Sequence, residues 1–407
     1  MLNMKISSAL FEHFSFFRNK EMDALYVALA LMSFAIGLVG IFVPVFLWKE
    51  GEPIWRILLF ILLDSVYIVA IILAVLPFFR RLSDKTLMLA SLPFAALYYL
   101  GLDFIKELPL LFYFLPLLHA SYAIFFNTGY HINFTGASDG DYLGREIGAR
   151  HLISSLTHMA APFLGGLIIA SIGFKYTFAF GAALLFFAIT PLFYFPAHRA
   201  SPDLSRKTII KYLFYKPIMP FTVSGAGYAM ETIIGRITWP LFLFIILGSI
   251  ESLGAIISLG LLAGVFVTFY MGFLSDAGKR RKIILWSSVF LSAIWAARYF
   301  LFRPVLVSIS EPLGNAVGNS LGVAWESQYY RIARSVPDGA SFILSRELLY
   351  NAVRIPYMLI LMVGAYFFEP VLFLKSSFVI AALVSLMFMF ANMTHTSVVS
   401  RSFFKNA

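Results

Sequence analysis

The chain has 407 residues, of which 60% are hydrophobic and only 13% are charged. Because soluble domains contain about 25% charged residues, this composition excludes an ordinary soluble protein and indicates a chain that lies mostly in lipid. The formal net charge of +10 is typical of a membrane protein with basic loops on one side of the bilayer, and we predict no nucleic-acid partner.

Twelve apolar stretches are each long enough to cross a bilayer, which takes about 20 helical residues. Segments such as Ile57 to Leu63 are apolar on every face, which argues against the amphipathic helices of a soluble bundle. We therefore expect an all-α integral membrane protein. The predicted spans are 24–48, 54–79, 86–104, 108–131, 147–172, 175–196, 217–247, 251–273, 282–302, 305–331, 342–367 and 370–393.

A polar, basic segment at 197–216 separates the sixth span from the seventh and predicts a linker between two halves. We expect a tail at 1–22, a six-helix bundle at 23–196, the linker, a second six-helix bundle at 217–395 and a tail at 396–407.

Lysines and arginines gather in the tails, the linker and alternate loops, all of which fall on one side of such a bundle. The opposite loops contain only Lys49, Arg56, Lys106, Lys175, Arg303 and Lys375. The positive-inside rule then places both tails in the cytoplasm, which requires an even number of spans. We predict a multi-pass protein of the plasma membrane.

Three short motifs recur in the same order in the two halves, which indicates duplicated six-helix bundles. The segment IFVPVFL at 41–47 resembles TWPLFL at 238–243, and Leu-Ser-Asp occurs at both 82–84 and 274–276. The pair Arg145 and Glu146, at the start of the fifth span, recurs as Arg346 and Glu347 at the start of the eleventh.

The segment GFLSDAGKRRK, at 272–282, resembles the loop signature of the major facilitator superfamily through Gly272, Asp276 and a basic cluster that includes Arg280. The first-half copy keeps Asp84 but has Arg80 where the glycine belongs. An aspartate at a helix N-terminus is favoured by the helix dipole, and a basic cluster beside it pairs with it and with anionic lipids. We expect this loop to hold the two halves together, although a merely topogenic basic loop is the alternative.

The fifth span contains a second, partial motif. Pro162, Gly165 and Gly166 resemble the end of the proline and paired-glycine motif of drug and proton antiporters in the same superfamily. Helix count, orientation and duplication extend the resemblance over nearly the whole chain. It implies the major facilitator fold, a monomer, and a central path lined by the first, fourth, seventh and tenth helices.

Polar residues inside spans are costly and usually face a cavity or a partner. In the tenth span they recur every three or four residues and predict a stripe that faces water. This stripe consists of Ser308, Glu311, Asn315, Asn319, Gly322 and Glu326. Gly314, Gly318 and Gly322 form a ridge of small residues, for which close helix packing is the alternative.

The seventh span places Ser224, Tyr228 and Glu231 on one face. Glu231 lies near mid-membrane and is the leading candidate for coupling transport to protons, although a structural pair with a neighbouring helix would also explain it. Arg236 lies about 140° around the helix from Glu231 at 100° per residue, so the two should not pair. A helix break at Gly235 and Pro240 would loosen that conclusion. In the fourth span, His119, Tyr122, Phe126 and Tyr130 form a weaker stripe.

Asp64 and Arg354 lie at similar depths in the second and eleventh spans. The resemblance places these helices against each other across the two halves. We therefore predict a salt bridge between the two residues in one of the two access states.

The sequence contains no cysteine, no paired histidines at metal-ligand spacing and no phosphate-binding glycine loop, so we expect no enzyme, metal site or cofactor. We expect a secondary transporter of a small organic solute that is proton-coupled, exports its substrate and contacts membrane lipids. A lipid or glycolipid translocase and a non-transporting receptor or scaffold are the alternatives.

Overall fold

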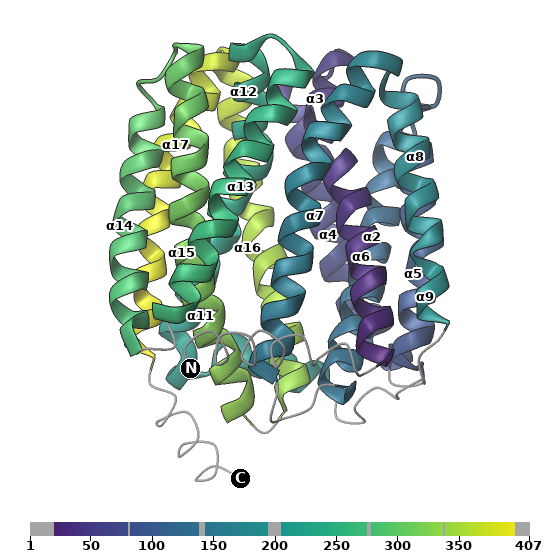
Figure 1. Ribbon diagram of the computed structural model, residues 1–407, viewed down its shortest axis with the longest axis vertical. Helices are drawn as coiled ribbons and strands as arrows, with labels where there is room; N and C mark the ends of the chain where they lie inside the picture. The colour runs from purple at the N-terminus through teal and green to yellow at the C-terminus, as the bar shows by residue number, and fades with distance from the viewer. Residues whose placement is uncertain are drawn as a thin grey trace, which may run out of the picture.

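The computed structural model describes residues 20–79, 82–137, 143–193, 205–274, 278–336 and 338–394. Every regular element in these ranges is a helix (Figure 1). The first half contains α2 (Lys20–Val39), η2 (Gly40–Phe42), α3 (Val43–Lys49), α4 (Ile54–Phe79), α5 (Asp84–Leu102), α6 (Leu111–Ala137), α7 (Leu143–Ile172), α8 (Phe174–Phe187) and α9 (Ile189–Leu192).

A short helix, α10 (Arg206–Leu213), and η3 (Lys216–Ile218) lie in the linker. The second half contains α11 (Met219–Ile233), the π-helical turn η4 (Ile234–Thr238), α12 (Trp239–Leu247), α13 (Ile250–Leu274), α14 (Arg280–Arg298), α15 (Pro304–Ser335), α16 (Gly339–Phe367), α17 (Pro370–Ser385) and η6 (Leu386–Met393). Each of the twelve predicted spans overlaps one of these helices or a continuous run of them.

Eight stretches in the described chain are long and apolar enough to cross a membrane, and two shorter apolar helices, Leu156–Ile172 and Phe174–Phe187, accompany them. The helices α14 and α15 are outside this set. The helix α15 is the one that carries the predicted polar stripe, so its lower hydropathy agrees with a position inside the bundle.

The same helix pairs pack together in both halves. In the first half α5 packs on α6, α4 on α6, α2 on α7 and α5 on α8. The equivalent pairs in the second half are α14 with α15, α13 with α15, α11 with α16 and α14 with α17. The two halves are therefore pseudo-symmetric six-helix bundles, as the repeated motifs predict.

The repeated proline motif marks a break in the first helix of each half. Pro44 follows η2 and lies in the first turn of α3, and Pro240 follows η4 and lies in the first turn of α12. Proline is tolerated there because the first turn of a helix has no intrahelical partner for its N–H. The segments α3 and α12 pack on each other across the two halves at the top of Figure 1.

Two helix pairs form most of the interface between the halves, α7 with α13 and α4 with α16. Phe163 N donates to Ser258 Oγ at 2.9 Å across the first pair, and the rings of Trp55 and Tyr366 meet edge to face across the second. The predicted contact between the second and eleventh helices is therefore confirmed.

Near the linker, the α4–α16 interface is covered by α10. Ile209 is buried in one apolar cluster with Ile72 of α4 and Leu344 and Leu348 of α16. Arg206 Nη2 also donates to Ala74 O at 3.3 Å. The linker thus contacts both halves rather than only connecting them.

Candidate functional site

The tenth-span stripe on α15 divides into a part that packs inside the second half and a part that borders open space. Asn315 Nδ2 donates to Glu311 Oε1 at 2.8 Å. Two glycines of α13 make room for the stripe. The amide of Asn315 packs against Gly260, and the amide of Asn319 packs against Gly264. A Cβ atom on Gly318 or Gly322 would meet no atom within 4 Å, so close helix packing does not explain these two glycines, and this face of α15 borders unfilled space.

The seventh-span residues Ser224 and Tyr228 position a tryptophan of α15. Trp325 Nε1 donates to Ser224 Oγ at 2.7 Å, and the Tyr228 ring stacks on Trp325 with 5.4 Å between centroids and an 8° interplanar angle. Ser224 is fully buried, whereas Tyr228 is half-buried. Of these two predicted site residues, Tyr228 is the one with a partly accessible surface.

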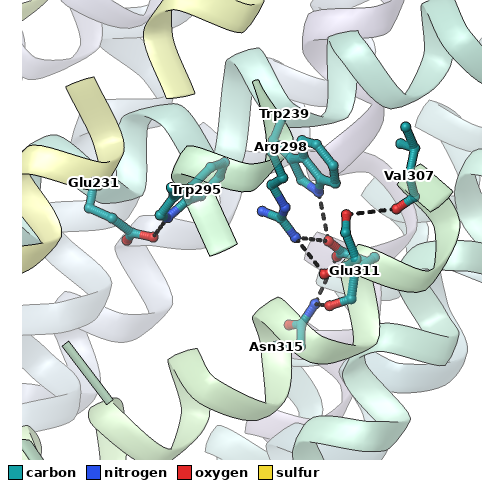
Figure 2. Close-up of polar contacts among 8 residues, drawn as sticks. Glu231, Trp239, Trp295, Arg298, Val307, Glu311 and Asn315 are labelled. Atoms are coloured by element: carbon teal, nitrogen blue, oxygen red, sulfur yellow. Dashed lines mark hydrogen bonds and ion pairs between the residues drawn. The ribbon is translucent and has the colours of Figure 1, made fainter. Parts of the chain in front are cut away.

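Glu231 points toward α14 rather than toward a cation. Its Oε1 accepts a hydrogen bond from Trp295 Nε1 at 3.0 Å (Figure 2). The described structure records no ion pair between Glu231 and Arg236, and the π-helical turn η4 that contains Arg236 interrupts the regular helix between them. The carboxyl group is half-buried and has a neutral hydrogen-bond donor as its partner, so either protonation state satisfies the contact.

A buried charged cluster lies deeper in the second half (Figure 2). Arg298 Nη2 lies 3.1 Å from Glu311 Oε2, which also accepts from Trp239 Nε1 at 2.6 Å. The guanidinium contacts the rings of Trp239 and Trp295, which are nearly perpendicular to each other, with its carbon 3.6 and 4.4 Å from their centroids. Glu311 belongs to the predicted polar stripe, whereas Arg298 was not predicted as a site residue, because a lone arginine at a span end resembles an interfacial residue.

A second charged group lies between the halves. His119 Nδ1 of α6 lies 2.8 Å from Asp64 Oδ1 of α4. Arg354 of α16 donates to Thr232 Oγ1 at 3.1 Å and to Ala229 O at 3.4 Å. Arg354 lies within electrostatic reach of both Arg236 and Asp64, and His119 within reach of Arg236. The residues come from both halves, so they surround the central interface.

These four residues also share a depth. At 1.5 Å per residue they lie roughly 12 to 20 Å from the helix ends at the top of Figure 1. Ionisable side chains at such a depth usually mark a substrate or ion pathway. Arg236 was not predicted as a site residue, although an arginine in an apolar run between Gly235 and Pro240 is a usable signal.

The residues predicted to act at the interface or in gating lie in several different parts of the structure. Asp84 is fully buried in the first turn of α5, where the dipole favours it, and Arg280 begins α14. Arg346 Nη2 pairs with the adjacent Glu347 at 2.9 Å and lies over the Tyr329 ring. Asp276 and the side chains of Arg145 and Glu146 lie outside the described residues, and Gly272 lies in the last turn of α13.

The partial antiporter motif lies at the interface between the halves. Gly165 packs against the backbone of Leu38 in α2, and a Cβ on Gly166 would lie 2.9 Å from Ile250 O of α13. Gly254 in turn packs on Pro162 O. The motif therefore brings the backbones of α7 and α13 together.

The predicted bridge between Asp64 and Arg354 is not formed in this conformation, because Asp64 pairs with His119 and Arg354 with α11. It stays a prediction for the other access state.

Since the chain has no cysteine, Asp64→Cys with Arg354→Cys can be tested with a short bifunctional thiol reagent in liposomes. We expect a cross-link, found by mass spectrometry, in a fraction of molecules; Trp55→Cys with Tyr366→Cys, on the same helices, is the control. If the control cysteines at 55 and 366 are cross-linked but the cysteines at 64 and 354 never are, the prediction is wrong.

No protein-family model and no curated protein matches the sequence. Solved structures do match. A crystal structure of the nucleoside transporter NupG in mutant form superposes with a TM-score of 0.69 at 13% identity, covering 92% of this chain and 99% of that chain. A second NupG crystal structure gives 0.67 at 13% identity, over 91% of this chain and 98% of that chain. The chain is therefore a multi-pass membrane protein with the fold of these transporter structures, which confirms the predicted major facilitator fold.

Proposed function

We propose that this protein is a secondary active transporter that moves a small organic solute across the plasma membrane by alternating access. The observation that carries the proposal is the charged group of Asp64, His119, Arg236 and Arg354 between two pseudo-symmetric bundles. Charges at membrane depth are retained where they serve a pathway, and binding sites in inverted-repeat carriers lie near the midplane between repeats. The likeness to a nucleoside transporter supports the fold that this mechanism needs.

We further propose that transport is coupled to protons through Glu231 and that it runs as export by antiport, with the cytoplasmic ends of the helices at the bottom of Figure 1. Glu231 is half-buried and accepts from Trp295 without an ion-pair partner in the described chain, so it can gain a proton without breaking a salt bridge. The antiporter-like motif of Pro162, Gly165 and Gly166, which lies at the contact between the halves, supports the direction.

The proposal is tested first by thermal shifts of the purified protein against drugs, sugars, amino acids, nucleosides and lipids at pH 5.5 and 7.5. A ligand at about 100 times its dissociation constant stabilises the folded protein by about 2.7 kcal/mol. The ligand that binds is then followed in proteoliposomes as uphill flux driven by a pH gradient and as exchange without a gradient. Stabilisation by lipids alone would favour lipid translocation, and binding without flux would favour a receptor or scaffold.

Glu231→Gln is expected to abolish uphill flux while exchange persists, because the amide still accepts from Trp295 but cannot carry a proton. Glu369→Gln is the matched control, since Glu369 is exposed and makes no side-chain cap. Uphill flux at the wild-type rate in Glu231→Gln would show that another group carries the proton.

A further inference from the structure

We propose that the transported solute carries a carboxylate or phosphate group and that this anion binds between Arg236 and Arg354. The inference rests on the proposed function and narrows it, because it names the chemical class of the substrate.

Arg236 is exposed although it lies in the middle of a membrane-crossing segment. It belongs to the π-helical turn η4, and such turns are frequent at functional sites. The neighbouring Ile237 and Thr238 are buried within the second half. Arg354 Nη2 donates to Thr232 Oγ1, which lies four residues before Arg236 on the same run of helices, so the two arginines belong to neighbouring parts of the seventh span and the eleventh.

Neither arginine has an acidic partner in the described part of the chain. Arg354 makes its hydrogen bonds to Ala229 O and Thr232 Oγ1, both neutral groups. Arg236 has no hydrogen bond or ion pair among the described residues. This contrasts with Arg298 and Arg346, which are each paired with a glutamate.

The acids around the two arginines are engaged elsewhere. Asp64 is paired with His119, Glu347 with Arg346, and Glu231 accepts from Trp295. Glu326, on α15, also has an interaction partner. In the described part of the chain, the two guanidinium groups thus lie at similar depths, and neither forms a salt bridge with a carboxylate.

A solute anion would supply the missing charge. Guanidinium groups bind carboxylates and phosphates through two parallel, charge-assisted hydrogen bonds. The aromatic rings of Tyr228 and Tyr350 lie 5.1 Å apart between centroids, and Arg354 lies over the Tyr350 ring at 5.9 Å. Tyr350 is buried, so the half-buried Tyr228 offers the partly accessible aromatic surface beside this site.

The test compares neutral and anionic partners of similar shape on the full-length protein in detergent. The probes are uridine against uridine monophosphate, glucose against glucuronate, and benzyl alcohol against benzoate, measured by thermal shift and titration calorimetry. We expect at least one of the three anionic probes to bind, and we expect no binding of the neutral probe of the same pair. Arg236→Gln and Arg354→Gln should each weaken that binding about 30-fold or more, as truncation of one member of a hydrogen-bonded charge pair does.

Arg303→Gln is the matched control, because Arg303 is exposed at the start of α15 and makes no side-chain cap. Arg236→Lys and Arg354→Lys should retain part of the affinity, and the melting temperature without ligand shows that each variant is folded. Binding of no anionic probe, equal binding of the neutral probes, or affinity that survives both glutamine variants would each overturn the inference. Flux in proteoliposomes distinguishes this inference from the proposed transport function. If neutral solutes are transported and the arginine variants transport them at the wild-type rate, transport is supported and the anion site is contradicted. If an anion binds but no flux is measured, the anion site is supported and transport is contradicted.

Discussion

Arg298→Met is expected to destabilise the protein by about 3–5 kcal/mol, because it leaves the carboxylate of Glu311 buried without its counter-charge. Both side chains are almost completely buried, with 4% of Arg298 and 8% of Glu311 exposed. The variant also loses the cation–π contacts of the guanidinium with Trp239 and Trp295. The measurement is the free energy of unfolding by denaturant in mixed micelles, together with the melting temperature.

The double variant separates lost charge pairing from lost packing. Adding Glu311→Gln to Arg298→Met should recover much of the stability, because the amide oxygen still accepts from Trp239 and the uncompensated charge is gone. The exposed Arg303→Met should change stability by less than about 0.5 kcal/mol. If the double variant is no more stable than Arg298→Met, the loss comes from packing, and the buried-charge explanation is wrong.

Gly254→Val is expected to reduce transport more than tenfold without unfolding the protein. A Cβ atom at this position would collide with Pro162 O of α7, so the backbones of α7 and α13 cannot approach as they do here. Overpacking costs about 1–3 kcal/mol, which shifts an equilibrium between two states by about 5–150-fold. The valine therefore disfavours the access state in which this contact is closed.

The measurement pairs initial transport rates with the accessibility of single cysteines placed along the central path, which the cysteine-free sequence allows. Gly364→Val is the control, since a Cβ there makes only ordinary contacts, at 3.4 Å or more, with Phe373 and Phe368 of the same half. Equal transport by both variants would show that the close approach of α7 and α13 is not needed in the cycle.

The sequence by itself determined the all-helical membrane fold and the duplication. These follow from hydropathy and repeated local motifs, because a helix in lipid must satisfy its own backbone and be apolar over about 20 residues. Asp84 lies in the first turn of a helix, as predicted, because the helix dipole favours an aspartate at an N-terminus whatever the surrounding tertiary structure.

Only the tertiary structure decided which polar side chains meet. Asp64 was expected to pair with Arg354 but pairs here with His119, and Ser224 on the polar face of the seventh span is buried beneath Trp325. The exposed Arg236 depends on a π-helical turn that rotates the following residues around the helix, and a regular 3.6-residue period does not describe that rotation. Partners contributed by distant helices depend on the packing of the two bundles, and no periodicity within a single helix contains that information.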